Sequence, residues 1–177
     1  MIKKTTLITA ACGLLAMAGL AQAQSTTTLS VAVGAEASLT VTTGTTNLTT
    51  SSTTFGNPFT GTTSLNYQIR TTKVGGTGAL TLKVTADFAG TGGPSVTTPP
   101  STGDALTYTC TVSSPGVACT GSQTASTAAA TGFGTWGANA NSTKAGNTAS
   151  VAWSLTDDPV YTTGTYTATT TFTIAAT

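Results

Sequence analysis

The stretch that decides the fold is the end of the chain, ASVAWSLTDDPVYTTGTYTATTTFTIAAT, residues 149–177. Apolar or aromatic residues alternate with small or polar ones in two runs, the first around Trp153 and the second around Phe172. A turn cluster at Pro159 separates the two runs. Strict period-two alternation with β-branched and aromatic residues is typical of half-buried β-strands. The pattern therefore predicts two neighbouring antiparallel strands at the end of the chain.

The same alternation recurs upstream and predicts an all-β protein. It appears in residues 26–33, 37–43, 64–72, 79–85 and 105–112, and in shorter form around Phe133 and Trp136. A glycine-rich turn joins residues 64–72 to residues 79–85, so these two segments are predicted to form a hairpin. Residues 88–104 contain two adjacent prolines and are predicted to be a long surface loop. Roughly seven to nine strands predict an immunoglobulin-like antiparallel β-sandwich of Greek-key type.

Composition narrows the functional classes. Threonine makes up about a quarter of the chain, whereas charged residues are 6% and histidine is absent. Without Lys3 and Lys4, four basic residues (6 − 2 = 4) face five acidic ones, a net charge near −1. No basic patch attracts phosphates, so nucleic acid is not an expected partner. A charge near zero also gives little protection against self-association.

The N-terminal residues predict export. Lys3 and Lys4 precede an apolar stretch, residues 7–20, that ends at Ala21-Gln22-Ala23, a typical signal-peptidase site. Residues 1–23 are therefore interpreted as a bacterial signal peptide, too short for a membrane anchor, and no membrane span is expected elsewhere. Lipidation at Cys12 is the less favoured alternative. The expected location is secreted, extracellular or cell-surface, with the periplasm as an alternative. Residues 24–177 would form one domain of 154 residues (177 − 23 = 154).

Two cysteines remain after residue 23, and they predict one disulfide. Cys110 and Cys119 flank a short segment with Pro115-Gly116, which can fold back and bring the thiols together. A redox or metal-binding pair is the alternative. It is disfavoured because the spacing is not C-x-x-C and the chain has no histidine. No metal or cofactor is expected.

The acidic residues are few, and they lie mostly at predicted turns. They are Glu36, Asp87, Asp104, Asp157 and Asp158. Aspartate in such places commonly bonds to nearby backbone. The alternatives are weak calcium binding at Asp157 and Asp158 and acid–base catalysis on a glycoside. A Ser-His-Asp triad is excluded because there is no histidine. We expect no catalytic residue and no enzymatic activity.

Three aromatic residues are candidates for ligand contacts. Trp153 alternates in step with Val151 and Leu155, which predicts a core position. Trp136 lies in a glycine-rich segment and is predicted to be the freer tryptophan. Trp136 and Tyr161 are therefore candidate ligand-binding residues, although core or edge packing is the simpler interpretation.

The closing TTGTYTATTTFTIAAT, with Gly164-Thr165-Tyr166 leading the last strand, resembles the end of secreted bacterial immunoglobulin-like sandwich proteins. Spore coat protein U-like and fimbrial-type subunits end in this way. The resemblance implies assembly by strand donation, in which an extended segment of one subunit completes the sheet of the next. Residues 24–33 are the candidate donor, and the alternative is an ordinary first strand of the chain's own domain.

These patterns favour a non-catalytic exported structural or cell-surface protein, such as a fimbrial or filament-type subunit. Its expected partner is another copy of itself or a surface component. The alternative is a secreted carbohydrate- or surface-binding module that uses Trp136 and the loop at residues 88–104.

Overall fold

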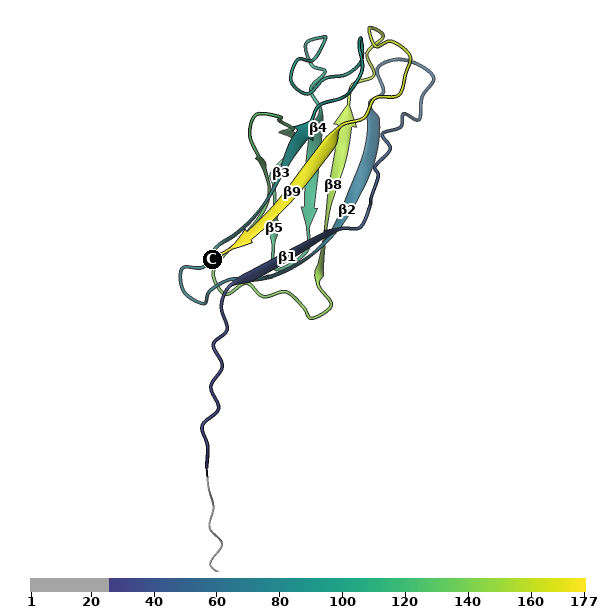
Figure 1. Cartoon of the computed structure of the whole chain (residues 1–177). Helices are drawn as coiled ribbons and strands as arrows, with labels where there is room; N and C mark the ends of the chain where they lie inside the picture. Colours follow the sequence, from purple (N-terminus) through teal and green to yellow (C-terminus); the bar gives the residue numbers. More distant parts are fainter. Residues whose placement is uncertain (1–25) are drawn as a thin grey trace, which may run out of the picture. The chain divides into compact units, whose positions relative to one another are not determined.

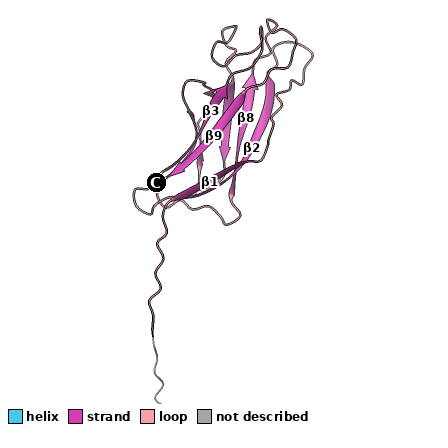
Figure 2. Ribbon diagram, in the orientation of Figure 1, coloured by secondary structure: helices cyan, strands magenta, loops and turns pink. Residues whose placement is uncertain are grey.

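The computed structural model describes residues 26–177, so the predicted signal peptide and Gln24 lie outside the described residues. The described residues form strands and no helix (Figure 2), and none of their segments meets the length and hydropathy of a membrane-spanning helix. The chain divides into two units, and the second, Val33–Thr177, is compact. All strands lie in the second unit: β1 (Glu36–Val41), β2 (Phe59–Arg70), β3 (Gly78–Ala86), β4 (Thr107–Val112), β5 (Val117–Ala118), β6 (Gln123–Thr124), β7 (Thr131–Trp136), β8 (Asn147–Leu155) and β9 (Thr169–Ala176).

The strands form two antiparallel sheets that pack together as a β-sandwich (Figure 1). One sheet has the order β1-β2-β8-β4-β6 and the other the order β5-β7-β3-β9. Every pair of neighbouring strands is antiparallel. The prediction of an all-β sandwich is confirmed, with nine strands among the described residues.

The core lies between the sheets and follows the period-two alternation read from the sequence. In β2 the buried residues alternate with exposed ones, and β3 and β8 repeat the pattern. A strand places successive side chains on opposite faces, so one apolar set faces the other sheet. Removing apolar surface from water contributes about 25 cal/mol per Å² to the free energy of folding. These buried side chains therefore make the main stabilising contribution to the sandwich. Its larger members are Leu65, Tyr67, Ile69, Leu80, Leu82, Val84, Leu106, Tyr108, Phe133, Trp136, Val151, Trp153 and Leu155.

Two predicted strand pairings are wrong. β2 and β3, expected to form a hairpin, lie in different sheets, and so do the closing strands β8 and β9. The chain crosses from one sheet to the other at Thr71, which is buried and joined to the loop after β7. Its N–H donates to the Ala140 carbonyl at 3.0 Å, and its hydroxyl donates to the Gly137 carbonyl at 2.7 Å. These bonds hold the crossing in place where a tight hairpin turn was expected.

The segment before β1 also differs from its prediction. Residues 26–35 form no strand, although Leu29, Val31 and Val33 alternate with small residues. The side chains of Leu29 and Val31 are 91% and 85% exposed. A strand requires a hydrogen-bonding neighbour. The favoured expectation, an ordinary first strand of the chain's own domain, is therefore not what the structure shows.

Candidate functional site

Hydroxyl groups cover the outer face of three neighbouring strands, β2, β8 and β4, in the five-stranded sheet. Strand register aligns them in rows that cross the sheet: Thr60–Ser154–Thr107, Thr62–Ala152–Thr109 and Ser64–Ser150–Thr111. These side chains alternate with core residues, as the pleat requires. The face is therefore a neutral surface of hydroxyl and methyl groups.

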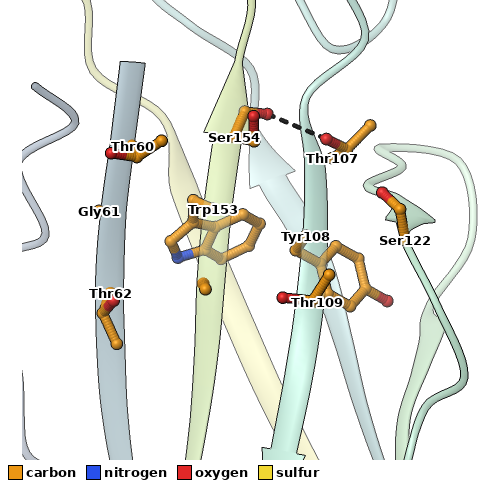
Figure 3. A pocket seen from close by; sticks show the side chains of 10 residues that line it. Thr60, Gly61, Thr62, Thr107, Tyr108, Thr109, Ser122, Trp153 and Ser154 are labelled. Atoms are coloured by element: carbon orange, nitrogen blue, oxygen red, sulfur yellow. Dashed lines mark hydrogen bonds between the residues drawn. The ribbon is translucent and has the colours of Figure 1, made fainter. Parts of the chain in front are cut away.

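A shallow hollow of about 320 Å³ lies over the first two rows, with Ser122 at one side (Figure 3). Thr107 Oγ1 donates a hydrogen bond to the Ser154 carbonyl at 3.2 Å. The side chains of Tyr108 and Trp153 belong to the core and are buried. The residues that line the hollow carry no carboxyl or amino side chain. The hollow can therefore form neutral hydrogen bonds, while the Tyr108 hydroxyl donates to Thr131 Oγ1 and the Gly132 carbonyl.

A second feature lies at the end of the sandwich where the long loops gather (Figure 1). Asp104, just before β4, is only 2% exposed. The Asp158 carboxylate, from the loop after β8, and the Tyr161 hydroxyl both lie against it. Asp104 Oδ2 and Tyr161 Oη are buried without a hydrogen-bond partner. Buried polar atoms usually have one, so this corner is atypical.

The carboxyl groups in this corner affect each other. Burial, and then the nearby Asp158 carboxylate, raise the pKa of Asp104 above its usual value. The Ser101 hydroxyl and the Val160 N–H hold the pKa of Asp158 below its usual value. Burial and the Asp104 carboxyl raise the pKa of Tyr161. Two adjacent carboxyl groups cannot both be ionised without cost unless a proton or a cation compensates.

Asp87 has the opposite environment, because its own loop satisfies it fully. Its carboxylate accepts hydrogen bonds from the N–H groups of Phe88 at 2.8 Å, Val96 at 2.7 Å and Thr97 at 3.0 Å, and from the Ser95 hydroxyl at 2.8 Å. Burial favours the neutral acid, but these bonds outweigh it and hold the pKa of Asp87 well below its usual value. Asp87 therefore organises the start of the long loop, in agreement with the predicted turn role.

The predicted disulfide between Cys110 and Cys119 is present. Cys110 lies in β4 of the five-stranded sheet, and Cys119 directly follows β5 of the four-stranded sheet. The bond thus joins the two sheets at the side of the sandwich where the strands are shortest. Its position between two packed sheets fits a structural role.

Neither tryptophan is exposed as an aromatic platform. Trp136 is 3% exposed, and its ring packs against Tyr67 with ring centroids 4.9 Å apart. The pairing of β3 with β7 shifts register between Leu80 and Thr81. Such a bulge inserts one extra residue, which lets Phe133 and Trp136 both face the core although they lie three positions apart. Trp136 is therefore not the freer tryptophan.

Basic side chains are sparse and, with one exception, unpaired in the part of the chain that is described. Arg70 in β2 pairs with Glu36 in β1 at 2.9 Å, and both groups are well exposed. Lys83 lies in β3, whereas Lys73 and Lys144 lie in connecting segments. An exposed pair of this kind contributes about 0–1 kcal/mol. Charge therefore plays a small part in stabilising the sandwich.

One side of the sandwich is incompletely covered. β1 and β9 are the edge strands of the two sheets there, and they contact each other. The apolar side chains that they turn toward the core, Leu39, Phe172 and Ile174, are only partly buried. β9 pairs with β3 alone, so its other edge carries unpaired backbone N–H and C=O groups.

No known family model, curated protein or solved structure matches this chain. Its function must therefore be inferred from its own residues.

The corner around Asp104 was not predicted as a site, although a signal for it exists. Asp104 has the same parity as Leu106, Tyr108 and Cys110, so it continues the inward-facing set of β4 by one step. A carboxyl group in phase with core residues is a candidate for burial. By contrast, Asp157 and Asp158 were predicted as a pair, but the structure combines Asp158 with Asp104 from another loop.

Proposed function

We propose that this protein is a non-catalytic, exported structural or cell-surface subunit of the immunoglobulin-like type, and that copies associate by strand addition. The observation that carries the proposal is an alternating apolar segment outside any strand, together with a sheet edge that lacks a neighbour. Each feature is a liability in an isolated molecule, and each compensates for the other when two copies meet.

The donor is the segment of residues 24–33, of which the structure describes residues 26–33. Leu29, Val31 and Val33 would share one face of a strand, and the residues between them are Ser30 and Ala32. Exposed apolar side chains in such a row signal an interaction surface when they are contiguous. Eight residues in extended form are enough to run along β9, which has eight residues.

The acceptor is the free edge of β9 in a second copy. Edge strands of soluble proteins are usually protected by charges, proline or a bulge that faces outward. β9 has the sequence TTTFTIAA and contains neither charge nor proline. An added strand would supply partners for the backbone groups of β9 and would bring Leu29 or Val31 near the partly buried Phe172 and Ile174.

Electrostatics favour the same association. The donor segment and β9 are both uncharged, so no like charges repel each other when they meet. The whole chain after residue 23 is close to neutral, which leaves little long-range repulsion between copies. Assembly by backbone hydrogen bonds should therefore depend little on salt concentration.

The test is a denaturing gel of the purified protein, run with and without boiling. A ladder of multiples that collapses to the monomer only on boiling supports the proposal. The Leu29→Asp/Val31→Asp variant places two charges on the apolar face of the donor and should run as a monomer. The Thr28→Asp/Ser30→Asp variant adds the same charge on the opposite face and should keep the ladder. Monomer in both lanes for the unaltered chain, or equal behaviour of the two variants, would refute strand addition.

The alternative of a carbohydrate-binding module has less support. It depended mainly on Trp136, and this ring is packed in the core against Tyr67. Sugars generally stack on exposed aromatic faces, and that face is not available here.

A further inference from the structure

We propose that Asp104 and Asp158 bind a calcium ion, which ties the loop before β4 to the loop after β8. The site is distinct from the β9 edge, and it does not depend on strand addition. It combines residues that lie 54 positions apart (158 − 104 = 54).

The first observation is the unpartnered oxygen of a buried carboxyl group. Asp104 is 2% exposed, and its Oδ2 atom has no hydrogen-bond partner. The groups beside this carboxyl are the Ser101 backbone, the carboxylate of Asp158 and the hydroxyl of Tyr161, whose oxygen is also buried and unpartnered. An unpaired buried polar group destabilises the folded state, and more so when it is charged. A ligand that these oxygens share would remove that cost.

The second observation is the charge of the corner. Asp157 also acts on Tyr161 through its charge, so a third carboxylate lies near this corner without converging on the other two. Within residues 26–177 the ion pair found is Arg70–Glu36, and no basic side chain lies within 4.0 Å of these three aspartates. A shared proton would neutralise one of three charges. A divalent cation neutralises two and leaves the corner close to balance.

The available ligands suit calcium rather than a transition metal. All are hard oxygen atoms: the two carboxylates and the Ser101 hydroxyl beside Asp158. No three His, Cys, Asp or Glu side chains converge into a metal centre in the described part of the chain. Two carboxylates completed by a hydroxyl and water would make a weak site, in the range of about 10⁻⁴–10⁻³ M that extracellular calcium modules use.

The experiment is thermal unfolding of the full chain at neutral pH with EDTA, with 10 mM CaCl₂, and with NaCl at matched ionic strength. For a Kd of about 1 mM, 10 mM calcium favours the folded state about 11-fold. This corresponds to a rise in Tm of about 4 °C for a chain of this size. Asp104→Asn and Asp158→Asn should each abolish the calcium-dependent rise. Glu36→Gln removes the same charge from an exposed carboxylate in β1, outside this corner, and it should keep the rise.

Three results would overturn the proposal. The first is an equal rise in NaCl, which would indicate general screening of the acidic corner. The second is a calcium-dependent rise that persists in Asp158→Asn. The third is a Tm that ignores calcium but falls between pH 5 and pH 8 in the unaltered chain and not in Asp104→Asn, which would show that the pair holds a proton. Isothermal titration with CaCl₂ on folded Asp104→Asn separates lost binding from lost folding.

Discussion

Replacing both disulfide cysteines by alanine should lower the free energy of unfolding by about 2.7 kcal/mol. The bond joins residues nine positions apart, Cys110 and Cys119. It therefore closes a loop of about ten residues in the unfolded chain, and this removes about 9 cal/mol/K of chain entropy. In the folded state the bond connects the two sheets next to β5, a strand of two residues. Loss of the bond should loosen β5 before the rest of the sandwich.

Urea denaturation of the Cys110→Ala/Cys119→Ala variant measures this loss. With an m-value of about 2 kcal/mol/M, the midpoint should fall by about 1.3 M urea. The m-value itself should rise slightly, because the unfolded chain without the cross-link exposes more surface. The reduced unaltered protein is the matched control and should behave like the variant. A loss below about 1 kcal/mol would refute the loop-entropy reasoning.

Two further predictions concern Trp136 and Asp87. Trp136→Ala should lower the free energy of unfolding by about 3–5 kcal/mol in the same urea assay, because it empties a packed core position beside Tyr67. Near-normal stability of this variant would contradict the burial of Trp136. Folding lowers the pKa of Asp87, so in acid the unfolded chain binds more protons than the folded chain. The stabilisation from Asp87 is therefore complete above about pH 4 and is lost progressively below it. The difference in Tm between the unaltered chain and Asp87→Asn should therefore be large at pH 7 and should shrink toward pH 2, and a difference independent of pH would contradict this.

The position of most strands could be predicted from the sequence, because alternation reports directly which side chains face the core. Ser64 to Thr72 and Ala79 to Thr85 were recognised as strands in this way, and both are strands in the structure. Which sheet each strand joins could not be predicted. Both sheets of a sandwich turn their apolar residues toward one core, so the same alternation fits either sheet. The short glycine-rich connection between β2 and β3 led to the prediction of a hairpin. In the structure the hydrogen bonds of Thr71 hold this connection as a crossing from one sheet to the other.

The candidate sites were harder to predict, because they depend on contacts between distant segments. The Cys110–Cys119 pair was recognised because its spacing is local. The prediction that Trp136 is the freer tryptophan was wrong because a bulge in β7 changes the phase of the alternation. No local signal in a glycine-rich segment marks such a bulge. The pairing of Asp104 with Asp158 joins two loops and depends on the packing of both sheets.

The scarcity of basic residues has a consequence for how the folded chain is digested by proteases. Proteases that cut after lysine or arginine find four such residues beyond residue 23, and two of them, Arg70 and Lys83, are held in paired strands. Cleavage requires local unfolding of a strand into the active site of the protease. Lys73 and Lys144 therefore remain as the accessible positions in the described residues, so digestion of the folded chain by such a protease should begin at these two connecting segments.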